Sequence, residues 1–150
     1  MKDKTVKDIM TTEVITVTPQ TSIRELVDIL GRHRINGVPV VDENGKLAGI
    51  VTEADVVDQS RKLHIPSFFN FMDSVIFLED PSVLEKEIKK MTGTTVGDIM
   101  TEDVQTVTPE TVVQDVATLM AEKHIQTIPV LDNDRLVGIV GRWDIVKSLI

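Results

Sequence analysis

The chain contains no cysteine, no tyrosine, one tryptophan and four phenylalanines among its 150 residues. Without cysteine it can form no disulfide, no thiolate nucleophile and no cysteine-ligated zinc site. No apolar run approaches the roughly 18–20 residues that a membrane-spanning helix needs. The first residues contain no apolar signal-peptide core, so we expect a cytoplasmic protein with no membrane partner.

Basic residues are also few: 16 lysines and arginines stand against 24 aspartates and glutamates, and the net charge is −8. The densest basic cluster is the short Arg32-His33-Arg34. An acidic surface repels phosphate backbones, so we expect no nucleic-acid partner. The sequence has no glycine-rich phosphate loop and no evident nucleophile–base pair. His33, His64 and His124 share no metal-ligand spacing, and we expect no metal and place them at the surface or at helix ends.

What the chain does contain is a duplication. Val6-Lys7-Asp8-Ile9-Met10-Thr11 returns 90 residues later as Val96-Gly97-Asp98-Ile99-Met100-Thr101. Thr16-Val17-Thr18-Pro19 returns at the same offset as Thr106-Val107-Thr108-Pro109. Matching blocks of this length, in one order, indicate two tandem repeats of one structural unit.

We divide the chain into a first repeat over residues 1–63, an insert over 64–95 and a second repeat over 96–150. The insert contains all four phenylalanines: Phe68, Phe69, Phe71 and Phe77. A flexible linker would be less aromatic, so we interpret the cluster as sealing a core edge or a dimer contact, with a ligand lid as the alternative. A capping box at Ser82 predicts a helix that ends near Gly93.

The first half of each repeat predicts a strand and a helix. Residues 14–17 form a short β-rich run that ends at a Thr-Pro pair. Apolar residues at i, i+3, i+4 and i+7, starting from Ile23 and again from Val113, then predict a helix. Capping-box patterns at Ser22 and Thr111 mark the two helix starts.

The second half of each repeat predicts two strands and another helix. In the first copy the strands cover residues 38–41 and 46–51, and Asn44-Gly45 favours a hairpin turn between them. The last helix begins near Thr52 in the first copy and near Gly141 in the second. The predicted order is β-α-β-β-α, twice, in an α+β fold.

Three recurring motifs resemble the CBS domain, named after cystathionine β-synthase. They are Asp-Ile-Met-Thr at each repeat start, Gly37-Val38-Pro39-Val40-Val41-Asp42 with its copy Ile128-Pro129-Val130-Leu131-Asp132, and Gly49-Ile50-Val51-Thr52-Glu53-Ala54-Asp55. The resemblance covers about two thirds of the chain and is specific for the fold. It implies two repeats packed through their sheets about a pseudo-two-fold axis, with two clefts between them.

The resemblance also implies a function, although less specifically. CBS domains occur as tandem pairs and bind adenosine-containing ligands, so we expect a non-catalytic regulatory or sensor module that needs no cofactor. AMP, ADP or ATP is the expected ligand, and S-adenosylmethionine or NAD is less favoured. Because no catalytic domain is attached, we expect a free-standing pair. It is expected to form a homodimer, and an unidentified protein partner is possible.

In CBS domains the residues that match Thr52 and Asp55 hold the ligand, and the resemblance implies the same roles here. A carboxylate one turn into a helix can accept hydrogen bonds from both ribose hydroxyls, and a hydroxyl at the helix start can donate to a phosphate. The alternative is purely structural, because Thr-x-x-Asp is also a capping box.

The second copy departs from this pattern. Gly141 replaces the threonine, Arg142 replaces Glu53, and Asp144 is retained. Arg142 either binds a phosphate or is a solvated surface residue. We interpret Trp143 as a packing residue rather than one that stacks on a base. The two clefts should therefore differ, with the Arg142 cleft preferring ADP or ATP over AMP.

The resemblance implies that the base lies between the first strand and the segment before the second strand, where backbone groups can contact an adenine edge. The alternative is that these positions are ordinary strand ends. The positions are Thr16, Val17, Asn36, Gly37, Val38, Thr106, Val107, Gln126, Thr127 and Ile128.

Two other classes of function remain open at this point. The first is a ligand-free dimerisation or protein-interaction module that regulates a partner protein. The second is an enzyme acting on the nucleotide, against which the lack of a metal motif and of an acid–base pair counts.

Overall fold

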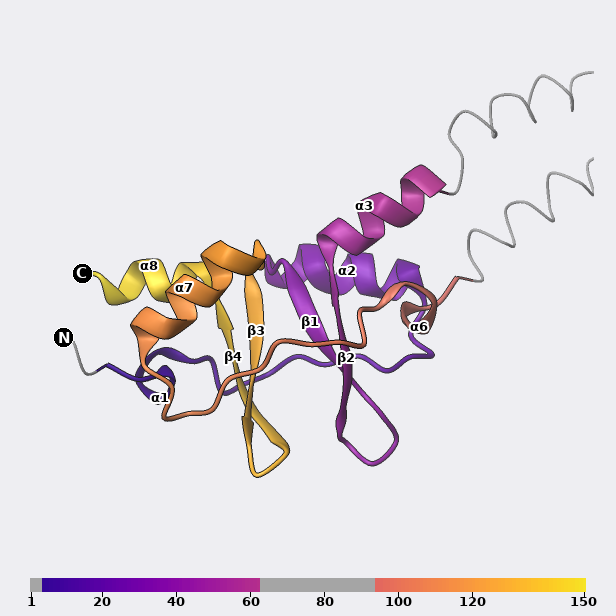
Figure 1. Ribbon diagram of the computed structural model, residues 1–150. Coiled ribbons are helices and arrows are strands. Elements are labelled where there is room, and N and C mark those ends of the chain that lie inside the picture. The colour runs from indigo at the N-terminus through magenta and orange to yellow at the C-terminus, as the bar shows by residue number, and fades with distance from the viewer. Residues whose placement is uncertain (1–3, 63–93) are drawn as a thin grey trace, which may run out of the picture.

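The computed structural model describes residues 4–62 and 94–150. The phenylalanine cluster, the helix expected from Ser82 and His64 lie outside these ranges. The described chain forms two similar units side by side, each a two-stranded antiparallel hairpin with helices at one end (Figure 1). The α+β fold and the pair of repeats about a pseudo-two-fold axis are confirmed.

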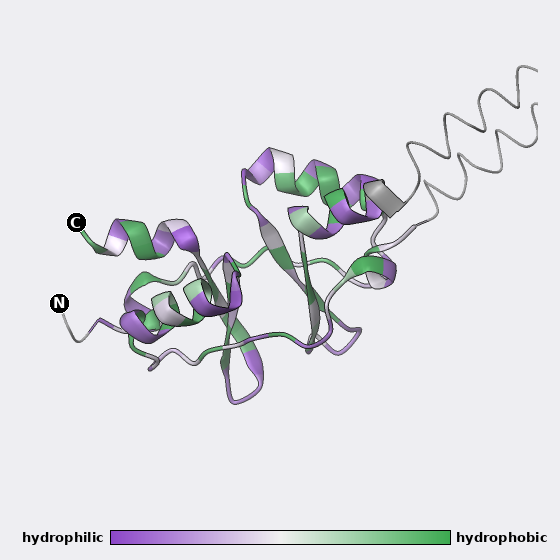
Figure 2. Cartoon of the chain, turned by 45° about the horizontal axis from the view of Figure 1, so that its top comes forward, coloured by the Kyte–Doolittle hydropathy of each residue, from purple (hydrophilic) through white to green (hydrophobic). Residues whose placement is uncertain are grey.

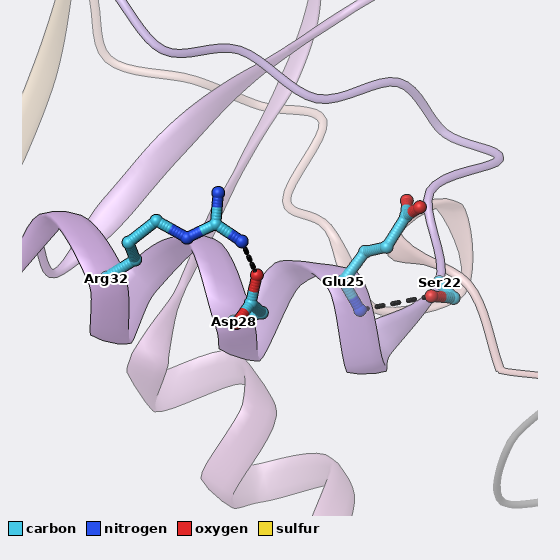
Figure 3. A network of polar contacts seen from close by, with 4 residues as sticks. All are labelled: Ser22, Glu25, Asp28 and Arg32. Carbon is cyan, nitrogen blue, oxygen red and sulfur yellow. Dashed lines mark hydrogen bonds and ion pairs between the residues drawn. The ribbon is translucent and has the colours of Figure 1, made fainter.

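The first unit consists of two helices and two strands: α2 (Ile23–His33), β1 (Gly37–Val41), β2 (Leu47–Thr52) and α3 (Glu53–Lys62). The hydroxyl of Ser22 accepts a hydrogen bond of 3.1 Å from the Glu25 N–H, so α2 begins as its capping box predicts (Figure 3). On the exposed face of the same helix, Arg32 pairs with Asp28 four residues earlier, an ion pair that contributes little in water.

The second unit repeats this order: α7 (Val113–Lys123), β3 (Thr127–Asp132), β4 (Arg135–Gly141) and α8 (Arg142–Ser148). The capping box predicted at Thr111 is wrong, because Val112 is the N-cap of α7 and no side chain caps it. The Thr111 hydroxyl instead accepts a hydrogen bond of 3.0 Å from the Thr108 N–H and closes the turn before the helix. Val112 occupies the place of Ser22, so this repeat has lost the cap.

The strand predicted over residues 14–17 is reduced to a single residue. The Val17 N–H donates to the Pro39 carbonyl at 3.1 Å, and the Val41 N–H donates to the Val17 carbonyl at 2.9 Å. Val107 forms the same isolated parallel bridge in the second unit. The run cannot continue, because the next residues enter a turn that the Thr21 hydroxyl closes on the Thr18 N–H.

The short helix α1 (Val6–Ile9) belongs by sequence to the first repeat but packs in the second unit (Figure 1). The Val6 N–H donates to the Thr111 carbonyl at 2.8 Å, and the Val113 N–H donates to the Lys4 carbonyl at 3.0 Å. Val6 is fully buried in the core of that unit, together with Val116. The first repeat therefore supplies part of the second core.

The exchange is reciprocal, because α6 (Val96–Ile99) packs in the first unit. The Val96 N–H donates to the Thr21 carbonyl at 2.8 Å, and Val96 is fully buried beside Leu26. Hydrophobic and hydrophilic residues alternate along α2 and the other helices in Figure 2, as expected for elements with one buried face. Because each core contains a helix from the other repeat, neither unit is complete alone.

None of the helices in residues 4–62 and 94–150 is both long enough and apolar enough to cross a membrane. The longest of them, α2 and α7, have 11 residues each, whereas a spanning helix needs about 20.

Two glycines give the exchanged segments room to lie against the strands. A Cβ on Gly49 would lie 2.7 Å from the Thr101 carbonyl oxygen, and one on Gly138 would lie 2.6 Å from the Met10 sulfur. Thr101 forms an isolated antiparallel bridge with Ile50, next to Gly49. The need for glycine is stricter at Gly49, where the neighbouring atom belongs to the backbone, than at Gly138, where it is the end of the flexible Met10 side chain.

Gly49→Ala is expected to lower the free energy of unfolding by about 1–3 kcal/mol, because the backbone oxygen of Thr101 must move away. Gly31→Ala is the matched control: a Cβ there, in α2, meets nothing within 4 Å. It should raise the stability by about 0.5–1 kcal/mol, as alanine favours a helix interior. Urea unfolding curves would measure both, and equal effects in the two variants would contradict the close approach.

Candidate functional site

A cleft of about 240 Å³ opens between the two units at the N-terminus of α3. Its volume is slightly below the roughly 300 Å³ at which small-molecule pockets usually begin. The lining comes from both repeats: Asn36, Ile50, Thr52, Glu53, Ala54, Asp55, Thr101, Asp103, Val104, Gln105, His124, Ile125, Gln126 and Thr127. A molecule in this cleft would contact both units at once.

Asp55 lines this cleft, and only one of its two carboxylate oxygens accepts a hydrogen bond from the described residues. Its Oδ2 accepts hydrogen bonds from the Thr52 N–H at 2.9 Å and from the Thr52 hydroxyl at 3.2 Å. The Asp55 N–H donates back to the Thr52 hydroxyl at 3.4 Å, which completes a capping box. The Oδ1 oxygen accepts no hydrogen bond from the described residues. Capping of the helix therefore uses only the Oδ2 oxygen of this carboxylate.

The two units meet through equivalent amides at the edge of the cleft. The Asn36 amide nitrogen donates to the Gln126 side-chain oxygen at 2.8 Å, and these residues hold the same place in the two repeats. The backbone carbonyl of each of these two residues also accepts a hydrogen bond from the first residue of a helix. The Asn36 carbonyl accepts the Glu53 N–H at 2.8 Å, and the Gln126 carbonyl accepts the Arg142 N–H at 2.9 Å. This pair links the two helix N-termini across the pseudo-two-fold axis.

Asp144 is placed like Asp55, but its carboxylate contacts two residues rather than one. Its Oδ2 accepts the Gly141 N–H at 2.8 Å, and its Oδ1 lies 3.6 Å from the Lys147 ammonium. Trp143, interpreted above as a packing residue, is 67% exposed, so that interpretation is wrong within a single chain. The reason is its position on the outer face of α8, away from the core.

The sequence model of the CBS domain matches residues 6–62 and 96–150. The chain belongs to the CBS domain family. CBS pairs are typically regulatory modules, and the match indicates no catalytic family.

Relatives of this CBS pair include an uncharacterized protein, MJ1426, of Methanocaldococcus jannaschii. The two are 29% identical over 156 residues, which are 97% of this chain and 90% of that protein. The chain is also 32% identical over 151 residues to the chloroplastic CBS domain-containing protein CBSX2 of Arabidopsis thaliana. That match covers 96% of this chain but 63% of CBSX2.

Two solved structures resemble the CBS pair closely and hold adenosine compounds. The CBS domain pair of protein MJ0100, in complex with 5′-methylthioadenosine and S-adenosyl-L-methionine, has a TM-score of 0.71 and 31% identity, covering 97% of this chain and 95% of that one. CBSX2 in complex with AMP has a TM-score of 0.72 and 29% identity, with the same two coverages. Both likenesses agree with the predicted fold.

The structure brings some of the predicted site residues of the CBS pair to the cleft and leaves others away from it. Those that line it are Asn36, Thr52, Asp55, Gln126 and Thr127. Four others are buried core residues: Val17, Val38, Val107 and Ile128. Thr16 and Thr106 are exposed strand-end neighbours, and Arg142 and Asp144 lie at the start of α8.

Two of the positions expected to contact an adenine are already occupied by internal contacts. The N–H and carbonyl groups of Val17 and Val107 pair with the strands beside them. At Gly37, the group that approaches closely is the Thr52 side chain, whose Cγ2 would lie 2.9 Å from an added Cβ. The lack of a side chain at Gly37 therefore leaves room for the neighbouring strand β2, which contains Thr52.

Sequence reasoning missed the residues that the second repeat contributes beside α3. Asp103, Gln105 and His124 line the cleft, and His124 does so as the left-handed C-cap of α7. The exchange of α1 and α6 carries residues 101–105 across to β2, where Thr101 pairs with Ile50. The repeated Met-Thr pair was the feature of the sequence that could have indicated this contact. It does not specify which strand the threonine pairs with.

Proposed function

We propose that this CBS pair is a non-catalytic regulatory module that binds an adenosine-containing ligand in the cleft beside α3. The observation that carries the proposal is that Asp55 lines a cleft formed by both units while its Oδ1 accepts no hydrogen bond from the described residues. The AMP complex of CBSX2 and the adenosine complexes of MJ0100 support it, because both proteins resemble this chain over 97% of its length.

The ribose is the part of the ligand that Asp55 would hold. A carboxylate oxygen accepts hydrogen bonds from two vicinal hydroxyls, and such charge-assisted bonds are about twice as strong as neutral ones. The capping box keeps the carboxylate in one orientation, which lowers the entropy cost of binding. Thr52 serves here mainly to orient Asp55, since its hydroxyl already donates to that carboxylate.

The adenine would lie against the part of the lining that the second repeat supplies, which comes from residues 101, 103–105 and 124–127. Ile125 and Val104 supply apolar surface, and Gln105 and Gln126 supply amides that can pair with the polar edge of the base. In this arrangement the backbone of Val17 and Val107 takes no part.

Regulation would follow from the position of the ligand between two units. The ligand shifts their relative arrangement only if it binds one arrangement more tightly than another. The Asn36–Gln126 hydrogen bond lies at the edge of the same cleft and is the contact that such a shift would change first.

We expect the pair to act as a homodimer formed through α3 and α8. Val57 in α3, Trp143 in α8 and Leu149 at the C-cap of α8 are 68%, 67% and 77% exposed, so the described residues leave large apolar side chains uncovered. Light scattering at micromolar concentration should give twice the mass of the chain, and a monomeric mass would contradict this expectation.

Melting curves with a panel of nucleotides test the proposed function. At a hundred times its Kd a ligand stabilises a protein by about 2.7 kcal/mol, a shift that is easily measured. Adenosine compounds should raise the melting temperature, and guanine nucleotides should do so less. If no adenosine compound at millimolar concentration shifts it, the interaction module without a ligand is the better description.

A further inference from the structure

The charged side chains that line the cleft are almost all acidic. Glu53, Asp55 and Asp103 contribute three carboxylates, and among the described lining residues His124 alone has a basic group. Neither lysine nor arginine occurs among the described residues that line it. Glu53 and Asp103 are both exposed.

The equivalent positions on the other side of the pseudo-two-fold axis have a different balance. Arg142 takes the place of Glu53, Glu13 that of Asp103, and Arg34 that of His124, while Asp144 matches Asp55. Two arginines and two carboxylates leave that set neutral. Arg34 is also a left-handed C-cap, as His124 is, so the backbone conformation at this position is the same in both repeats.

The difference in charge between the two sets is clearest at Glu53 and Arg142. Each is the first residue of its helix, and each backbone N–H donates to the carbonyl of the amide residue at the cleft edge, Asn36 or Gln126. The backbone contact is therefore the same, and only the sign of the side-chain charge is reversed.

A phosphomonoester carries about −1.5 to −2 charges at pH 7 and is repelled by carboxylates at short range. A sulfonium or an uncharged thioether at the 5′ position of the ribose meets no such repulsion. The repulsion therefore lowers the affinity of phosphorylated ligands only, because Asp55 would hold the ribose of every adenosine ligand in the same way.

We propose that the cleft beside α3 selects adenosine ligands that carry no phosphate, with a neutral or cationic 5′ group. Glu53 and Asp103 are the specificity-determining residues that exclude phosphorylated ligands. This inference rests on the proposed function, since it concerns which adenosine ligand occupies the same cleft.

Calorimetric titration with S-adenosylmethionine, 5′-methylthioadenosine, AMP and ATP tests the proposal. Asp55→Asn identifies the heat that belongs to this cleft, and it keeps a side-chain oxygen that can accept the Thr52 N–H. At this site 5′-methylthioadenosine should bind about tenfold or more tightly than AMP, and ATP more weakly still. Higher salt should weaken S-adenosylmethionine and strengthen AMP, because it screens attraction and repulsion alike.

Glu53→Gln should strengthen AMP about three- to tenfold, weaken S-adenosylmethionine and leave 5′-methylthioadenosine unchanged. Glu43→Gln is the control, since Glu43 is an exposed carboxylate in the β1–β2 turn and does not line the cleft. If AMP binds this cleft as tightly as 5′-methylthioadenosine and Glu53→Gln changes neither, the charge selection is wrong while the proposed function stands. If no adenosine compound binds, the proposed function is wrong too.

Discussion

Val6→Asp is expected to lower the free energy of unfolding by about 4 kcal/mol or more, enough to unfold many proteins of this size. Val6 is fully buried against the core of the unit formed mainly by the other repeat. A carboxylate there must leave water without gaining a partner, and burying an unpaired charge is among the most costly single changes. Denaturant unfolding followed by circular dichroism measures the loss.

Lys7→Asp is the matched control for this variant. Lys7 is the next residue of α1 and is exposed, and an acidic residue in the first turn of a helix is tolerated. Its effect should stay within about 0.5 kcal/mol. A comparably small effect for Val6→Asp would show that α1 does not pack in the second unit.

Val96→Asp should destabilise the chain as strongly, because Val96 fills the same place in the first core. Since each core contains a helix from the other repeat, both variants should unfold both units in one transition. Two separate transitions would contradict the exchange.

Asp55→Ala is expected to weaken the binding of an adenosine ligand by about a hundredfold or more. It removes the oxygen that would accept both ribose hydroxyls, and hydrogen bonds to charged groups contribute about 1.5–3 kcal/mol each. The same change removes the acceptor that caps α3, which lowers the stability by about 1 kcal/mol. Isothermal titration calorimetry measures the first effect and thermal unfolding the second.

Asp98→Ala separates binding from capping. Asp98 closes the same Thr-x-x-Asp box at α6, where its Oδ2 accepts the Thr95 N–H at 2.8 Å, but it does not line the cleft. It should lower the stability without changing the affinity. Equal loss of affinity in the two variants would mean that Asp55 acts only through its helix.

Local patterns in the sequence were sufficient for much of the fold. The period of the apolar residues placed α2 and α7, the Ser22 box marked the start of α2, and the Thr52–Asp55 pair marked the start of α3. These features depend on hydrogen bonds and side-chain spacing within one or two turns, so neighbouring residues determine them.

The predictions that failed depended on contacts between distant residues. Residues 14–17 have the composition of a strand, but only Val17 meets a partner, because the chain on either side of it leaves the sheet. Trp143 was expected to be packed, yet its side chain on α8 is 67% exposed. Strand propensity and residue size do not specify which surfaces meet.

By itself the sequence determined that the chain is a duplicated α+β CBS pair, that Val6 and Val96 are apolar residues in equivalent places, and that Thr52 and Asp55 lie at a helix start. Only the tertiary structure decided in which core each valine is buried. Both cores are built from nearly the same residues, so an apolar pattern satisfies either one equally well. That choice carries residues 101–105 beside α3, so that Asp103 and His124 line the same cleft as Asp55.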